Sequence, residues 1–289
     1  MSERAIVEND SEPKANMDAI YVQPDPRAYF RELAKVDYTI PDLAKPIFRR
    51  LVEALSERRA IPLQALDLGC SYGVNAALLK HDLSMEDLRQ HWTRGALAHA
   101  TAKEIVEADR EFFGEDRADN DIAVIGLDQS EPAIAFAEEA GLLESGMAVD
   151  LENVPLPAII AEKLAGTDLV LSTGAVGYIT EQTFGKLLPA ITRDSTPWIA
   201  NFVLRMFPFD AIAETLAQWG YVTEKLEGRT FVQRSFVSDG EQARVIAALE
   251  KLGIDAAGLE SEGQLHAEFF LSRPRDEAEA LPLERLLAD

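Results

Sequence analysis

The segment "ALDLGCSYGVNAALL" (residues 65–79) constrains the fold most, because it has the pattern of a buried strand, a glycine turn and a helix. Its apolar run ends at Leu68, and the small residues Gly69, Ser71 and Gly73 then occupy every second position before an apolar helical pattern begins. In a doubly wound sheet such a turn lies at the carboxyl end of a strand, where glycines let a ligand approach the backbone. The segment therefore predicts a ligand-binding α/β domain.

The alternation of strand and helix continues along the chain. Short apolar runs separated by helical segments occur at 64–68, 122–127, 146–150, 168–172 and 198–204, and two further strand patterns, at 230–237 and 265–274, flank a helix at about 240–252. This order is typical of a parallel sheet with helices on both faces. We expect an α/β fold with a doubly wound, seven-stranded, mostly parallel sheet and an antiparallel C-terminal strand.

Three regions extend this simple pattern. Residues 1–16 are polar and aperiodic, which predicts a disordered tail, and residues 17–60 contain helical patterns at about 27–35 and 46–58, which we interpret as an N-terminal helical lid. Residues 61–289 form the α/β domain, with a helical insertion at about 81–120. Ser84 is suited to cap a helix there, since it precedes acidic residues that favour the first turn.

Composition excludes several classes of partner. The formal net charge of −22, with no long basic cluster, disfavours nucleic acids and anionic membranes. The single cysteine, Cys70, excludes a disulfide framework and a thiolate metal site. No apolar run is long enough to span a bilayer, and the polar N-terminus does not resemble a signal peptide. We therefore expect a cytoplasmic protein with a small-molecule substrate.

The residues of the glycine turn exclude two common nucleotide sites. A nicotinamide fingerprint needs glycines at positions 69, 71 and 74, but this chain has Ser71 and Val74. No Gly-Lys-Ser/Thr sequence follows, so the turn is not a phosphate-binding P-loop. The ligand of this turn must therefore belong to another class.

The pattern Asp67-x-Gly69-x-Ser71-x-Gly73 resembles motif I of the class I S-adenosylmethionine-dependent methyltransferases, D-x-G-x-G-x-G, with Ser71 in place of the middle glycine. The resemblance implies S-adenosylmethionine as co-substrate. Asp67 would help to hold its amino group, through solvent or the turn, while backbone N–H groups would face its carboxylate. The alternative is that these glycines serve only a tight strand-to-helix turn.

Three later segments resemble further motifs of that family in the expected order. The resemblance implies that an acid after the second strand binds the ribose hydroxyls, that an acid after the third meets the adenine, and that small residues of the fourth pass beneath the sulfonium. Outside motif I, the implied cofactor-binding residues are Asp128, Gln129, Asp150, Leu151, Ser172 and Thr173. Asp128 could alternatively act only at a helix N-terminus. The gap between Gly73 and Asp128 also far exceeds the roughly 20 residues typical of such a unit.

Aromatic residues supply the catalytic candidates, because methyl transfer depends chiefly on positioning and aromatic rings stabilise a sulfonium. We assign Tyr21, Tyr29 and Tyr178 as catalytic candidates, and Phe30, Tyr38 and Arg205 as candidates for substrate binding. Tyr29 and Phe30 could instead anchor the lid, and Arg205 could be an ordinary surface arginine. The four histidines share no helical face and have no cysteine partners, so no metal is expected.

Three functions remain open at the level of sequence. The first is methyl transfer to an O or N nucleophile of a small molecule. The second is consumption of S-adenosylmethionine as an alkyl substrate, with cyclisation of its aminobutyrate arm to azetidine-2-carboxylate and release of methylthioadenosine. The third is a non-catalytic binding module. The sequence names neither the acceptor nor the oligomeric state.

Overall fold

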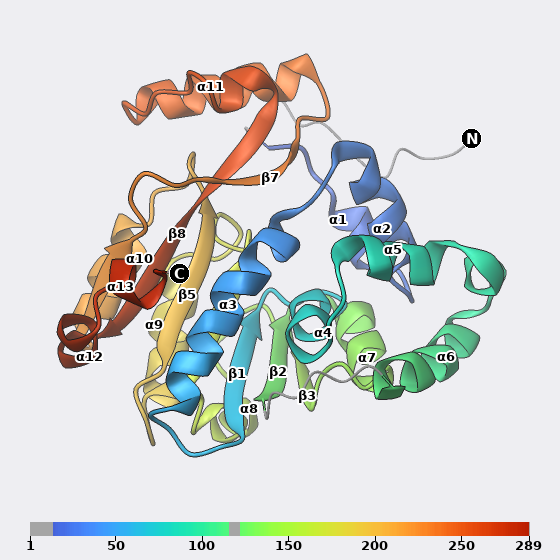
Figure 1. Ribbon diagram of the computed structural model, residues 1–289, viewed down its shortest axis with the longest axis horizontal. Helices are drawn as coiled ribbons and strands as arrows, with labels where there is room; N and C mark the ends of the chain where they lie inside the picture. The colour runs from blue at the N-terminus through green and yellow to red at the C-terminus, as the bar shows by residue number, and fades with distance from the viewer. Residues whose placement is uncertain (1–13, 116–121, 289) are drawn as a thin grey trace.

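A single mixed sheet forms the centre of the molecule (Figure 1). The computed structural model describes residues 14–115 and 122–288. Within them the strand order is β3-β2-β1-β4-β5-β8-β6, and β7 pairs with β8. The strands are β1 (Leu63–Leu68), β2 (Ile122–Asp128), β3 (Ser145–Ala148), β4 (Leu169–Thr173), β5 (Trp198–Leu204), β6 (Tyr221–Lys225), β7 (Phe231–Ser235) and β8 (Gln264–Pro274).

The pairing confirms a doubly wound, mostly parallel sheet. Strands β1 to β5 pair in parallel, whereas β8 runs antiparallel to β5 and carries both β6 and β7 on its other side. The described chain has eight strands rather than the seven expected, because β6 was missed. Only Tyr221 of β6 is buried, and the polar residues that follow it hide the strand in the sequence.

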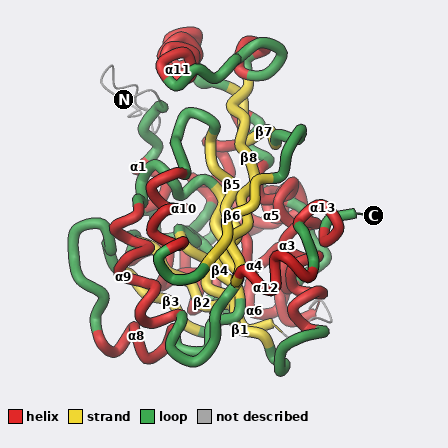
Figure 2. Tube along the Cα trace, turned by 90° about the vertical axis from the view of Figure 1, so that its left-hand side faces the viewer, coloured by secondary structure: helices red, strands yellow, loops and turns green. Residues whose placement is uncertain are grey.

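Helices cover both faces of the sheet, as the view in Figure 2 shows. On one face lie α3 (Ile40–Ser56), α4 (Val74–Lys80) and α7 (Glu131–Glu139), whose apolar residues share a core with β1, β4 and β5. On the other face lie α8 (Ala158–Leu164), α9 (Glu181–Ile191) and α10 (Asp210–Ala217). Helix α11 (Asp239–Lys251) connects β7 to β8, and α12 (Arg275–Ala280) and α13 (Leu283–Leu286) follow β8. Two apolar layers thus fix the strand ends that form the site.

The N-terminal region divides into two parts. Helices α1 (Asp18–Tyr21) and α2 (Arg27–Leu33) lie beside the carboxyl ends of the strands, whereas α3 packs along the sheet itself. Helix α3 begins at Ile40 rather than at Pro46, because Pro41 occupies the first turn and Pro46 lies inside the helix. Pro46 removes one backbone hydrogen bond, and the apolar face that α3 buries in the core outweighs this loss.

The insertion contains α5 (Met85–Thr93) and α6 (Ala102–Glu115). Ser84 caps α5 as predicted: its Oγ accepts from the Asp87 N–H at 3.2 Å, and the Asp87 carboxylate accepts from the Ser84 N–H at 2.8 Å. The ring of Trp92 lies 4.9 Å from that of Phe30, and its indole N–H donates to Asp109. The insertion therefore packs against α2 and away from the β1–β2 pairing.

The predicted tail, residues 1–16, lies mostly outside the described residues, but its end does not. Ala15 is buried, and its N–H donates to Glu241 Oε1 at 2.7 Å. No described helix combines the length and apolar character required to cross a bilayer.

Candidate functional site

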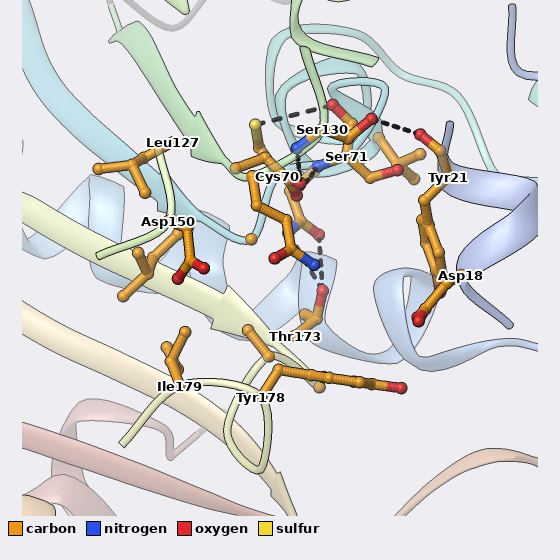
Figure 3. Close-up of a pocket in the computed structure, with 18 of the residues that line it drawn as sticks. Asp18, Tyr21, Cys70, Ser71, Leu127, Ser130, Asp150, Thr173, Tyr178 and Ile179 are labelled. Carbon is orange, nitrogen blue, oxygen red and sulfur yellow. Dashed lines mark hydrogen bonds between the residues drawn. The ribbon is translucent and has the colours of Figure 1, made fainter. Parts of the chain in front are cut away.

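A cavity of about 440 Å³ opens at the carboxyl ends of the parallel strands. Figure 3 shows Leu127 and Asp150 on one side of it and Tyr21 on the other, with Thr173 and Tyr178 between and below them. The cavity is thus bounded by the loops after β1 to β4 and by helix α1. This is the position at which α/β sheets bind ligands.

The glycine turn is held in the left-handed backbone region. Gly69, Ser71 and Gly73 have φ values of +79°, +49° and +76°. A side chain at Gly69 would place its Cβ only 2.7 Å from the Cβ of Ala175, so this position must remain glycine. The turn therefore brings its backbone directly against the cavity, where Gly69 and Ser71 form part of the wall.

Asp128 connects the second strand to this turn. Its Oδ2 accepts from the Ser71 N–H at 2.9 Å, and its Oδ1 accepts from the Ser130 N–H at 2.9 Å. Burial raises the pKa of Asp128, although these backbone hydrogen bonds oppose the rise. The long insertion has therefore not displaced Asp128 from the turn. Each carboxylate oxygen keeps lone pairs for a ligand in the cavity.

Asp67 lies one layer behind the cavity. It is fully buried, and its Oδ1 accepts from Asn75 Nδ2 at 3.0 Å, while Asn75 also donates to Thr173 Oγ1 at 3.1 Å. Asn75 and Thr173 line the cavity, but Asp67 does not. Burial, and then the neighbouring Asp128, raise the pKa of Asp67 to about 7. Asp67 thus orients Asn75 rather than contacting a ligand itself.

This raised pKa predicts a pH-dependent stability. Between pH 4 and about pH 7 the Asp67 carboxyl ionises in the unfolded chain but stays protonated in the fold, so stability falls as pH rises. We expect Asp67→Asn to remove this slope. Urea denaturation of the ligand-free proteins at pH 5 and pH 8 measures the effect. An equal change in unfolding free energy for both proteins would contradict it.

Acidic residues after β3 form the far wall. Asp150 accepts from the Glu152 N–H at 3.1 Å and from Asn153 Nδ2 at 2.7 Å. Burial would raise the pKa of Glu152, but hydrogen bonds from Thr183 and Thr180 outweigh it and lower the pKa. Leu151 is buried and lines the cavity beside Asp150. A carboxylate and apolar side chains thus meet on this wall.

Four tyrosines line the opposite side. The ring of Tyr29 lies 5.7 Å from that of Tyr21 and 6.1 Å from that of Tyr38. Burial raises the pKa of Tyr21 and Tyr29 well above the usual value, and that of Tyr38 to about 12, so all three hydroxyls are neutral at pH 7. Tyr178 is half exposed, and Lys14 Nζ lies 4.9 Å from its ring centroid.

The turn itself holds this aromatic wall in place. The Tyr72 hydroxyl contacts the carbonyl oxygens of Ile20 and Gln23 at 2.9 and 3.0 Å. The Ser130 hydroxyl donates to the Tyr21 carbonyl. Helix α1 is therefore fastened both to the glycine turn and to the loop after β2.

The structure brings eleven of the predicted site residues to the cavity. These are Gly69, Ser71, Asp128, Gln129, Asp150, Leu151, Thr173, Tyr21, Tyr29, Tyr38 and Tyr178. Asp67, Gly73 and Ser172 lie behind its surface, since strand alternation turns Ser172 to the face opposite Thr173. Gly73 instead packs near Ala137 and Leu142.

Two predicted substrate-binding residues do not line the cavity. Phe30 packs on Trp92 and lines a separate hollow between α2 and α5. Arg205 pairs with Glu260 and donates to the Asp255 carbonyl at 2.8 Å, so it stabilises the segment before β8. Both corrections have one cause. Each side chain is of a type that could bind a substrate, but in the folded protein it contacts a partner outside the cavity.

The sequence reasoning missed Lys14, Asn75 and Gln233, which all line the cavity. Asn75 follows the glycine turn directly, and a polar residue on the apolar face of a helix is a usable signal. Gln233 lies in a strand remote from every motif. Within the described ranges, no group of three or more His, Cys, Asp or Glu side chains is arranged to hold a metal ion.

The topology and the site agree with the resemblance that the sequence motifs carry. Five parallel strands pair with an antiparallel strand, β8, that lies between β5 and β6, and Gly69, Asp128, Asp150 and Thr173 line one cavity in the order that the sequence motifs predict. This is a doubly wound, Rossmann-like α/β fold, and it resembles the fold of the class I S-adenosylmethionine-dependent methyltransferases. Among solved structures, the plantazolicin methyltransferase BamL, in complex with a triazolic desmethylPZN analog and SAH, is similar over 89% of this chain and 97% of its own, with 12% identity and a TM-score of 0.44.

Two other solved structures are similar with lower TM-scores. A TehB-like SAM-dependent methyltransferase from Corynebacterium glutamicum shares 14% identity over 77% of this chain and 85% of its own, with a TM-score of 0.37. Magnesium protoporphyrin IX methyltransferase (ChlM) from Synechocystis shares 12% identity over 78% and 79%, with a TM-score of 0.36. No protein-family model and no curated protein sequence matches the chain.

Proposed function

We propose that this protein is an S-adenosylmethionine-dependent methyltransferase that acts on an O or N nucleophile of a small molecule. One observation carries the proposal. Asp128, at the end of β2, accepts from the Ser71 N–H of the glycine turn, and Asp150, after β3, faces the same cavity. The site thus has two acids at the ends of successive strands and a glycine turn whose backbone a ligand can approach closely. This combination suits a ligand that has both a diol and an amino-bearing ring.

The cavity suggests how the co-substrate lies. The free lone pairs of Asp128 would accept the ribose hydroxyls, and Leu127, Val149 and Leu151 offer an apolar slot for the adenine. Asp150, which lines the same wall, would accept from the adenine amino group. The sulfonium would then lie towards the end of β4 and the tyrosines.

Methyl transfer from a sulfonium requires little from the protein beyond positioning of the two reactants. When bound, S-adenosylmethionine would supply an activated methyl group: a bond from the nucleophile to the methyl carbon would form as the C–S bond breaks, the electron pair would stay on sulfur, and the proton of the O–H or N–H nucleophile would pass to water. The faces of Tyr21, Tyr29 and Tyr178 would stabilise the cation by up to about 2 kcal/mol where water is excluded. Helix α1, held to the glycine turn by the Tyr72 hydroxyl, would shield one side of the reacting atoms from solvent.

Product analysis tests the proposed function. We expect S-adenosylhomocysteine only when a nucleophilic acceptor is added, and slow or no turnover of S-adenosylmethionine alone. Mass spectrometry of both incubations is the measurement, with boiled protein as control. Methylthioadenosine formed without any acceptor would instead establish the cyclisation, and tight binding with no product across an acceptor panel would establish a binding module.

A further inference from the structure

Gln233 presents an unused hydrogen-bond acceptor to the cavity. Its side chain is 2% exposed and lines the cavity, and its Oε1 has no hydrogen-bond partner among the described residues. Buried amide oxygens in native proteins are nearly always paired, so an orphaned one requires a reason. A ligand whose N–H or O–H group donates to Oε1 would give this oxygen its partner.

The strand that carries Gln233 is distorted at this residue. Val232 pairs with His266 and Arg234 with Leu265, so Gln233 is the extra residue of a β-bulge in β7. Bulges of this kind redirect a side chain and are common beside active sites. The Thr39 N–H donates to the Gln233 carbonyl at 2.9 Å, and this bond ties the bulge to the start of α3.

Gly174 makes room for the amide. It has a φ of +73°, and a Cβ at this position would collide with Gln233 Nε2. The carboxamide therefore lies directly over the backbone that follows β4. Under the proposed function this is the end of the cavity to which the methyl group points. Gln233 thus faces the acceptor and not the adenosine.

The neighbouring side chains set the chemistry of that acceptor. Gln233 is uncharged, and burial keeps the hydroxyls of Tyr29 and Tyr38 neutral by raising the pKa of each. The amine that lies over the Tyr178 ring belongs to Lys14, and burial, together with the charge of Arg234, lowers its pKa to about 7. The guanidinium of Arg234, the next residue, is turned away into a buried ion pair with Glu241, at 2.6 Å. The rings offer flat apolar walls, and Gln233 adds one hydrogen-bond acceptor.

From this arrangement we infer that Gln233 is the specificity-determining residue for the acceptor, and that the acceptor is a small uncharged molecule with a flat aromatic body and an N–H or O–H group. The inference rests on the proposed function. It assigns to Gln233 the hydrogen bond that orients the nucleophile, with the N–H or O–H donating to Oε1.

Matched aromatic probes test this inference without knowledge of the natural acceptor. Indole and benzothiophene have the same shape, but only indole carries an N–H donor. Ligand-observed NMR with the protein saturated with S-adenosylhomocysteine gives their relative affinities. We expect indole to bind about tenfold more tightly, and Gln233→Leu to abolish the preference because it removes the acceptor while keeping the volume. The exposed Gln218→Leu, a control of the same chemical change, should keep it.

Several results would overturn the inference. Equal or undetectable binding of the two probes, retained preference in Gln233→Leu, or tighter binding of benzylammonium or benzoate than of indole would each do so. The affinity for S-adenosylhomocysteine, measured by calorimetry, separates this failure from that of the proposed function. It should be the same in the native protein and in Gln233→Leu; a large loss there would place Gln233 at the co-substrate, and no binding to the native protein would refute the proposed function itself.

Discussion

Asp128→Ala is expected to weaken S-adenosylmethionine binding by about 100-fold or more. A hydrogen bond to a charged group contributes about 1.5–3 kcal/mol, and two such bonds to a diol would be lost, so a loss of about 3 kcal/mol corresponds to a factor above 100. The variant also leaves the N–H groups of Ser71 and Ser130 without their acceptor, which loosens the turn. The lost hydrogen bonds and the loosened turn both lower the affinity for S-adenosylmethionine.

Isothermal titration calorimetry with S-adenosylmethionine measures this change. Asp276→Ala, at an exposed aspartate in α12, is the matched control and should bind like the native protein. Thermal denaturation of both variants shows whether they fold. If folded Asp128→Ala bound within threefold of the native protein, Asp128 would serve only to hold the N–H groups of Ser71 and Ser130, and the proposed adenosine orientation would fail.

Glu241→Ala is expected to cost about 3–5 kcal/mol of unfolding free energy, because it leaves Arg234 as an unpaired buried charge. Glu241 is fully buried, and Arg234 donates to both of its oxygens, at 2.6 and 2.9 Å. The same carboxylate accepts from the N–H groups of Ala15 and Val237. Its loss would therefore also release the chain that precedes α1 and reduce affinity for the co-substrate.

Urea denaturation at pH 7 measures the cost. The double variant Arg234→Met/Glu241→Leu should lose less stability than Glu241→Ala, since neither charge is left alone. Burial would raise the pKa of Glu241, but hydrogen bonding and the charge of Arg234 outweigh it and lower the pKa. The stabilisation is thus present above the unfolded pKa and is lost as pH falls through the folded one. A cost for Glu241→Ala below about 1 kcal/mol, which is the range of exposed ion pairs, would refute the conclusion that the Arg234–Glu241 ion pair stabilises the fold as a buried pair.

The fold was readable from the sequence wherever a pattern was local. Buried parallel strands are short apolar runs, so β1, β2, β4 and β5 were located within a residue or two. Strand β6 was missed because an edge strand exposes polar residues on its open side. The start of helix α3 was predicted six residues late, since a proline can occupy the first turn or, where packing compensates, the interior.

For the site, the sequence by itself determined the residues next to the strand ends: Gly69, Ser71, Asp128, Asp150 and Thr173 all reach the cavity. Strand direction alone places such residues, because the carboxyl ends of parallel strands share one edge of the sheet. Only the tertiary structure decided three other outcomes. Arg205 forms an ion pair with Glu260, Asp67 acts through Asn75, and the bulge in β7 turns Gln233 into the cavity. Those outcomes depend on contacts between segments far apart in the chain, which no local spacing encodes.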